Sequence, residues 1–217
     1  MVTRPRAYAL LRANAISHAQ SLALILRTMR CRFLSKTDTQ RWTDLRNFDP
    51  AWDQRTQVIA SLIPRCSRII EFGAGRERLR TYLDDTCTYT PADLVKRGSN
   101  TVVFDLNKRP LPDLRALNPD VAIFGGVLEY IADIGDIPRW LARQVSLCIA
   151  SYECATSGLS PAARALEVLS RSKNGWMNHY GENQLKELFC AGRFTFDRKV
   201  NWGLPETGGN IFVFRKN

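Results

Sequence analysis

The chain has 217 residues, 45% of them hydrophobic, so it is long enough for one α/β domain with an extension and is not expected to be disordered over long spans. Its 31 Lys and Arg against 21 Asp and Glu give a net charge of +10, which favours anionic partners such as nucleic acid, acidic lipid or acidic saccharide. The six cysteines contain no C-x-x-C pair, which argues against a zinc site or a disulfide framework and for reduced thiols in a cytosolic protein.

Residues 1–37 form a basic extension, because they hold no Asp or Glu but seven basic residues: Arg4, Arg6, Arg12, Arg27, Arg30, Arg32 and Lys36. Apolar residues at three-to-four spacing predict one or two helices over Tyr8–Phe33, with His18 as a polar-face residue. The longest apolar run, Leu22–Leu26, is far below the roughly 20 residues that span a bilayer. No cleavable signal peptide is expected, because arginines follow this run.

Three interpretations of this helix stay open. It packs on its own domain or on a second subunit, as in a homodimer; it lies on an acidic membrane surface; or it is a transit peptide. The next segment, residues 38–50, is polar and is expected to be a linker anchored by Trp42 and Phe48, before one domain over residues 51–217.

That domain is predicted to open with a helix, Ala51–Ile63, and a strand, Ser67–Phe72, which ends in Glu71-Phe72-Gly73-Ala74-Gly75. Glycines at 73 and 75 allow unusual backbone torsions and close approach of a ligand. A helix predicted over Arg76–Leu83 would direct its N–H groups and positive dipole end at the turn. A dinucleotide fingerprint would need a third glycine where the chain has Arg78. A nucleotide-like ligand is the interpretation, and an ordinary strand-turn-helix corner is the alternative.

Each of the next two predicted strands carries an acidic residue: Asp93 lies within Tyr89–Val95, and Asp105 ends Thr101–Asp105. Asp93 lies 18 residues after Gly75, about where a doubly wound fold delivers a carboxylate to ribose hydroxyls. The alternative is that Asp93 caps a turn. Asp105 is placed to accept a hydrogen bond from an adenine amino group.

The fourth strand is predicted over the apolar residues 121–124, and Gly125 and Gly126 then open space at the carboxyl end of the sheet. The segment 153–183 is predicted to be an irregular binding loop or lid. The remaining predicted elements are helices Ile137–Gln144 and Gln184–Cys190 and strands Ser146–Ser151, Phe194–Asn201 and Asn210–Phe214.

Taken in order, these motifs resemble the class I S-adenosylmethionine-dependent methyltransferases over about Ala51–Asn217. The resemblance implies a Rossmann-like α/β fold: a seven-stranded, mostly parallel sheet with an antiparallel last strand and helices on both faces. It also implies S-adenosylmethionine as cofactor. The third loop glycine of that family commonly sits where this chain has Glu77, which puts the path of the loop in question.

The resemblance also implies roles for residues around the cofactor. Glu71, Gly73, Ala74 and Gly75 would hold the methionine moiety. The ribose, the adenine and the sulfonium side would be bordered in turn by Asp93 with Leu94, Asp105 with Leu106, and Gly125 with Gly126.

Methyl transfer depends more on positioning, worth roughly 7–11 kcal/mol, than on a general base, worth roughly 3–5 kcal/mol. A sugar hydroxyl is a poor nucleophile, so a base is still sought, with His179 and Glu129 as candidates. Candidate acceptor-binding residues are Tyr130, Tyr152 and Trp176, each with a packing role as the alternative. No metal-ligand cluster is seen.

The predicted function is S-adenosylmethionine-dependent methylation, with a saccharide or other small molecule as O-acceptor. The sequence around Tyr89, Asp105 and Gly126 is similar to that of small bacterial methyltransferases associated with polysaccharide biosynthesis. Such a protein would be cytoplasmic and peripheral at the inner face of the membrane. The alternatives are an RNA methyltransferase, favoured by the charge, and a non-catalytic scaffold.

Overall fold

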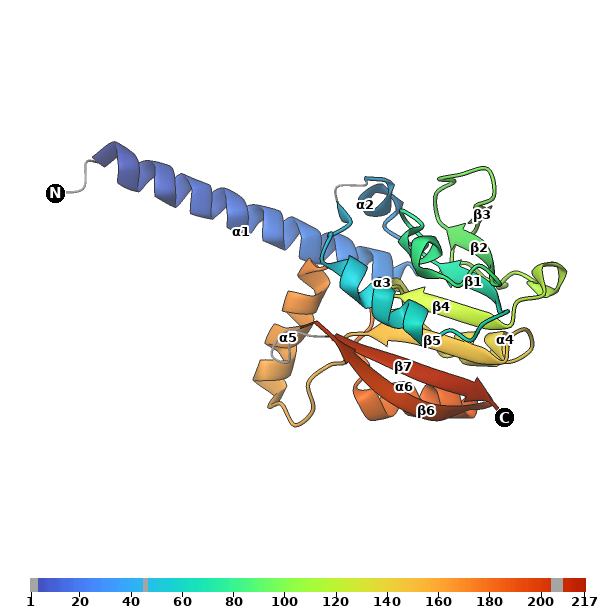
Figure 1. The fold of residues 1–217 in the computed structure, drawn as a ribbon. Coiled ribbons are helices and arrows are strands. Elements are labelled where there is room, and N and C mark those ends of the chain that lie inside the picture. The colour runs from blue at the N-terminus through green and yellow to red at the C-terminus, as the bar shows by residue number, and fades with distance from the viewer. Residues whose placement is uncertain (1–3, 45–46, 204–208) are drawn as a thin grey trace.

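The computed structural model describes the backbone of residues 4–44, 47–203 and 209–217, with side chains from His18 onward. A seven-stranded sheet with the order β3-β2-β1-β4-β5-β7-β6 forms the centre of the molecule (Figure 1). Strands β1 to β5 are parallel, and β7 runs antiparallel to both of its neighbours. The bounds are β1 Arg68–Phe72, β2 Thr88–Asp93, β3 Val102–Val103, β4 Val121–Gly125, β5 Leu147–Tyr152, β6 Phe194–Trp202 and β7 Gly209–Lys216. The predicted fold class is confirmed.

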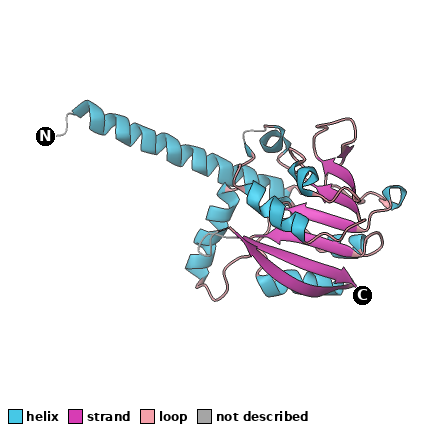
Figure 2. Cartoon of the chain, viewed as in Figure 1, coloured by secondary structure: helices cyan, strands magenta, loops and turns pink. Residues whose placement is uncertain are grey.

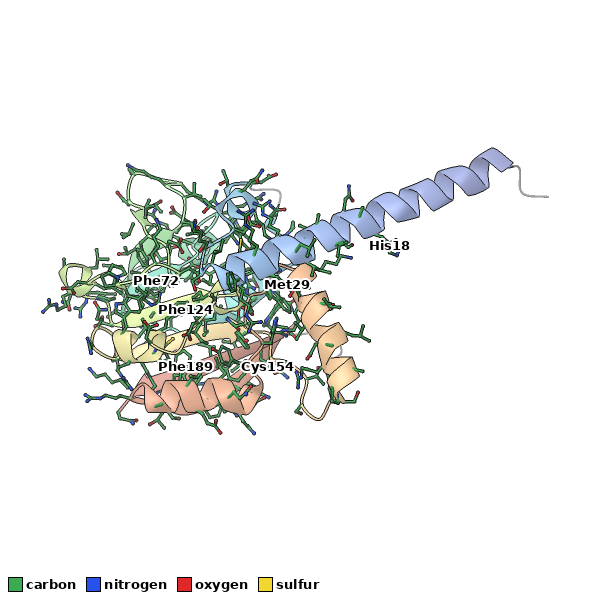
Figure 3. All side chains as sticks on the ribbon, turned by 180° about the vertical axis from the view of Figure 1, so that it is seen from behind. His18, Met29, Phe72, Phe124, Cys154 and Phe189 are labelled. Carbon is green, nitrogen blue, oxygen red and sulfur yellow. The ribbon has the colours of Figure 1, made fainter. Side chains whose placement is uncertain are left out.

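The two faces of the sheet are buried under separate layers (Figure 2). Helix α3 (Trp52–Ser61) and a 3₁₀ helix (Arg78–Tyr82) cover one face, where Ile59 and Leu79 pack with alternate residues of β1 and β4. Helices α4 (Ile137–Leu141) and α6 (Glu182–Ala191) cover the other. Figure 3 shows Phe72, Phe124 and Phe189 inside the body on this second side. Because both faces are covered, β4 is apolar throughout, as expected of a central parallel strand.

Two predicted elements are wrong. The helix predicted over Arg76–Leu83 is only the five-residue 3₁₀ helix, so the glycine loop does not lead into an α-helix. The stretch predicted to be irregular, 153–183, contains the helix α5 (Pro161–Lys173). Ser160 caps α5 by accepting a hydrogen bond from the N–H of Ala163, and proline occupies its first turn.

Helix α1 (Arg4–Phe33) is a single helix that projects from the body (Figure 1). Its C-terminal part packs on α5, and the chain then passes through the short helix α2 (Thr39–Thr43). His18 lies on the part of α1 beyond the body, and Met29 lies closer in (Figure 3). Within the described residues, no helix is long and apolar enough to cross a membrane.

Candidate functional site

A cavity of about 390 Å³ lies at the carboxyl ends of β1, β2 and β4, which is where open α/β sheets bind ligands. Of the residues predicted to bind the cofactor, Glu71, Gly73, Ala74, Asp93, Leu94, Asp105, Leu106, Gly125 and Gly126 line this cavity. Its volume lies within the range of small-molecule sites. The fold therefore gathers acids and glycines from four separate segments around one space.

The glycine loop after β1 needs glycine at both predicted positions. Gly73 and Gly75 have φ of +69° and +52°, in the left-handed region. A Cβ on Gly73 would lie 2.5 Å from Cγ2 of Val127, and one on Gly75 would lie 2.3 Å from Cε1 of Phe48. The loop is held to β2, because the N–H of Gly73 donates to the carbonyl of Ala92 at 2.8 Å.

Glu77, in place of the family's third glycine, has φ of +55°. This left-handed conformation costs a non-glycine residue roughly 1–2 kcal/mol. The substitution therefore leaves the chain in a conformation that glycine would adopt more readily.

Glu71 is buried at the cavity wall, with 8% of its surface exposed. Its Oε2 accepts a hydrogen bond from the hydroxyl of Tyr89. Burial raises the pKa of the Glu71 carboxyl to about 8, against the opposing effects of Tyr89 and the positive charge of Arg55. At neutral pH the group is thus mostly protonated.

Asp93 caps the glycine loop. Its Oδ2 accepts from the N–H of Gly75 at 2.9 Å, and its Oδ1 accepts from the N–H of Val95 at 3.0 Å. The turn-capping role considered for this residue is therefore observed. Oδ2 also forms an ion pair with Nε of Arg97 at 3.7 Å, and Oδ1 keeps capacity to accept a further hydrogen bond.

Asp105 is tied to the segment that precedes the domain. Its Oδ1 accepts from the hydroxyl of Thr37 at 2.5 Å and from the N–H of Asn107 at 2.9 Å. The side-chain nitrogen of Asn107 donates to Thr37 at 2.7 Å and to the carbonyl of Tyr130 at 3.0 Å. Asn107 thus joins Thr37, Asp105 and Tyr130, which all line the cavity.

The segment expected to be a linker covers the cavity. Trp42, Phe48 and Trp52 line it, and Trp42 also meets Tyr130 edge-on at 4.6 Å between ring centroids. Phe48 lies between Trp42 and Trp52, with centroids at 5.8 and 6.4 Å. Trp42 and Phe48 do anchor the segment, as predicted, and the described part of 38–50 is a cover over the glycine loop.

Arg55 is a cavity residue that the sequence analysis did not single out. Its guanidinium carbon lies 5.2 Å from the ring of Trp52 and 5.6 Å from that of Trp202. Desolvation lowers its pKa from the ordinary arginine value. Each cation–π contact offers about 0.5–2 kcal/mol, whereas removing an unpaired ion from water costs several. No sequence signal marks this arginine, because its environment comes from α3 and β6 together.

The predicted acceptor-side residues divide into two groups. Tyr130 lines the cavity, together with Gly125 and Gly126. Glu129, Tyr152, Trp176 and His179 do not lie among the described residues of its lining. The second group gathers around the loop after β4, on the side facing the end of β5.

This second group forms a buried polar cluster. Oε1 of Glu129 accepts from the N–H of Glu153 at 2.8 Å, and burial raises the Glu129 pKa. The Tyr152 hydroxyl donates to Asn178, whose side-chain nitrogen donates to the carbonyls of Leu128 and Ile131 at 2.6 and 2.8 Å. These contacts fix the loop that follows β4.

His179 and Trp176 both contact Arg171. The Nε of Arg171 donates to Nδ1 of His179 at 3.2 Å, and its guanidinium lies 4.7 Å from the Trp176 ring centroid. Burial and the charge of Arg171 lower the His179 pKa to about 4. His179 is therefore neutral at pH 7, as expected, but it is a weak base there. Trp176 donates from Nε1 to the hydroxyl of Tyr130 at 3.1 Å, which links this cluster to the cavity wall.

Comparison with known proteins places the fold. No family model matches the chain, and no curated protein matches it. Among solved structures, mitomycin 7-O-methyltransferase MmcR is 14% identical, with 92% of this chain and 68% of that one covered and a TM-score of 0.63. The 1,6-didemethyltoxoflavin-N1-methyltransferase of Burkholderia thailandensis, solved with 1,6-didemethyltoxoflavin and S-adenosylhomocysteine, is 17% identical, with 88% of each chain covered and a TM-score of 0.56.

Human N-acetylserotonin methyltransferase, solved in complex with S-adenosylmethionine, is 13% identical, with 82% of this chain covered and a TM-score of 0.59. This chain covers 56% of the human enzyme. At such identities the likeness establishes the fold, which is the Rossmann-like fold of these methyltransferases.

Proposed function

We propose that the chain is an S-adenosylmethionine-dependent methyltransferase that acts on a small acceptor and holds its methyl donor in the cavity at the carboxyl end of the sheet. The observation that carries this proposal is the convergence of Glu71, Asp93 and Asp105 with the glycine loop around one cavity. The likeness to methyltransferases solved with S-adenosylmethionine or S-adenosylhomocysteine supports it.

The residues present fit such a donor. Gly73 lines the cavity with bare backbone, because a Cβ there would lie 2.5 Å from Val127, and the carboxyl of neighbouring Glu71 faces the methionine end of the ligand in this proposal. Asp93 offers its spare acceptor capacity to the ribose hydroxyls, and Asp105 with Leu106 borders the adenine. The backbone at Gly125 and Gly126 lines the side where the acceptor would approach.

When bound, S-adenosylmethionine supplies an electrophilic methyl group. The chain's own contribution is to orient the two reactants and to exclude water under Trp42, Phe48 and Trp52. Orientation of this kind can account for roughly 7–11 kcal/mol of the barrier. Glu129 and His179 remain candidate bases by sequence, and neither belongs to the described lining of the cavity.

The acceptor is proposed only as a small molecule. A saccharide, and a role in polysaccharide biosynthesis, rest on sequence resemblance alone. RNA methylation has the net charge of +10 as its sole support.

Helix α1 favours a second property, attraction to an acidic membrane surface. Leu22, Leu26, Met29 and Phe33 follow one another at spacings of four, three and four, so they share a face of the helix. They are 56%, 58%, 40% and 88% exposed. With no Asp or Glu in residues 1–37, the charge around this apolar stripe is basic, which suits anionic lipid.

The donor site is tested by calorimetric titration of S-adenosylhomocysteine into three chains: wild type, Gly73→Arg and Gly158→Arg. Gly158 has φ of +72°, close to that of Gly73, but no atom lies within 4 Å of its Cβ position, so the same substitution strains the backbone without filling the cavity. We expect micromolar binding by wild type and Gly158→Arg, and at least about 100-fold weaker binding by Gly73→Arg. Absence of binding by wild type would overturn the proposal and favour a scaffold.

A further inference from the structure

Arg55 lies at the carboxyl end of β4, and it forms no ion pair with any of the described residues. Its Nη1 would lie 2.5 Å from a Cβ on Gly126, and its Nη2 lies 3.8 Å from the Cβ position of Gly125. The guanidinium therefore rests against the glycine pair, while the indoles of Trp52 and Trp202 flank it. Gly126, with φ of +70°, leaves the space that the guanidinium occupies.

No polar group within the described chain satisfies this cation. Its Nε is buried without a hydrogen-bond partner, and none of the described carboxylates lies within ion-pair distance of it. The other arginine of the cavity wall near α3, Arg78, is bonded to Asp53 at 3.0 and 3.1 Å. Arg55 is thus distinguished from a neighbouring arginine whose charge is already paired.

The nearest acid on the cavity wall does not fill this role. Glu71 is mostly protonated at neutral pH, and its Oε2 is already engaged by Tyr89. Glu129 acts on Arg55 electrostatically but lies outside the described cavity lining. The wall therefore presents a partly buried guanidinium that forms no ion pair with the described residues, an arrangement that suits an anion.

We propose that Arg55 binds a carboxylate group of the ligand that occupies the cavity. The guanidinium presents parallel N–H donors that match a carboxylate in a bidentate arrangement. This inference rests on the proposed function, since it deepens the assignment of that same cavity.

The carboxylate can come from two sources. The first is the α-carboxylate of the methyl donor, because Arg55 stands beside Glu71 and Gly125, where the methionine end is proposed to lie. The second is an acid on the acceptor, because Gly125 and Gly126 border the proposed side of approach. Trp42, Phe48 and Trp52 would then suit an aromatic acid.

The first arm of the test separates these sources by calorimetry on wild type, Arg55→Met, Arg55→Lys and the surface control Arg115→Met. The ligands are S-adenosylhomocysteine and 5′-methylthioadenosine, which lacks the amino-acid end. If the donor supplies the carboxylate, Arg55→Met weakens S-adenosylhomocysteine binding about 30-fold and 5′-methylthioadenosine binding less than about threefold. The affinity of Arg55→Lys for S-adenosylhomocysteine lies between those of wild type and Arg55→Met, because lysine keeps the charge but lacks the paired N–H donors of the guanidinium. Arg115→Met binds as wild type does. Retained binding of 5′-methylthioadenosine also shows that the variant is folded.

The second arm titrates benzoate, the simplest aromatic carboxylate, into the chains saturated with S-adenosylhomocysteine. If the acceptor supplies the carboxylate, Arg55→Met leaves S-adenosylhomocysteine binding unchanged and weakens benzoate binding at least about tenfold. The proposal is overturned if Arg55→Met changes the affinity for neither S-adenosylhomocysteine nor benzoate. It is also overturned if 5′-methylthioadenosine is weakened as much as S-adenosylhomocysteine, because Arg55 would then be only a structural residue.

Failure of the proposed function gives a different pattern. Wild type would then bind neither nucleoside, and benzoate would be titrated into the ligand-free chain. Benzoate binding that is lost in Arg55→Met would support the carboxylate site without a methyl-donor site. No benzoate binding by that wild-type chain would remove both proposals.

Discussion

Glu71 shows how strongly a buried position changes the chemistry of one residue. Burial raises the pKa of its carboxyl from an ordinary value of 4.5 to about 8. Between these two pH values the folded chain holds a proton on Glu71 that the unfolded chain has lost. The stability contributed by this group is therefore complete below about pH 4.5 and is lost as the pH rises through about 8.

We predict that the free energy of unfolding of the ligand-free wild type falls with pH across this window relative to Glu71→Gln. The slope of the difference should reach about 1.4 kcal/mol per pH unit, because one proton is involved. Urea denaturation of both chains at a series of pH values measures it. Subtracting the unfolding free energy of Glu71→Gln from that of wild type removes the pH dependence contributed by the other groups, which are the same in both chains. These groups include Glu129, whose pKa is also raised. Parallel profiles for the two chains would contradict the prediction.

At this scale the sequence predicts residues that end strands. Glu71 and Asp105 end apolar runs, so their place at the sheet edge follows from periodicity alone. Arg55 could not be predicted, because its burial depends on Trp202, which arrives from β6. Tyr152 ends a strand as expected, but its hydroxyl donates a hydrogen bond to Asn178, and no sequence pattern predicts this partner.

At the scale of elements, most of the exposed large apolar side chains among the described residues lie on α1. We predict that the full chain floats with vesicles of phosphatidylcholine and phosphatidylglycerol but not with phosphatidylcholine alone, and that added salt releases it. Leu22→Ser with Leu26→Ser should reduce the bound fraction at least about tenfold, because two exposed leucines lose their burial in lipid.

The matched control is Leu166→Ser with Leu169→Ser on α5, which are 68% and 40% exposed. It removes the same apolar groups and should leave flotation unchanged. If the chain does not bind acidic vesicles and its molecular mass in solution is that of a dimer, the apolar stripe pairs instead with a second copy of the chain.

Helices are predicted best where their apolar face packs on the sheet, as in α3 and α6, because burial imposes the 3.6-residue period. Helix α5 escapes prediction, since it packs on α1 and leaves Leu166 and Leu169 exposed. The segment before α3 looks like a linker because its structure consists of contacts made by single residues, Thr37, Trp42 and Phe48, with distant parts of the chain.

At the scale of the whole molecule, the order β3-β2-β1-β4-β5-β7-β6 is what turns scattered acids into one site. β1 lies between β2 and β4 in parallel register, so Glu71, Asp93 and Gly125 finish at the same edge. The alternation of strands and helices predicts this edge, and the fold is therefore predictable from the sequence. The cover formed by the described parts of residues 37–52 is not, because it depends on how the N-terminal segment returns across the sheet.

The central claim is that the cavity at this edge holds a methyl donor, and a crystal structure of the chain with S-adenosylhomocysteine tests it most directly. The account predicts density for the ligand against Gly73, with the ribose at Asp93, the adenine beside Asp105 and Leu106, and the amino-acid end toward Glu71 and Arg55. A crystal grown with saturating ligand that shows the cavity without it, or the ligand bound elsewhere, would contradict the account.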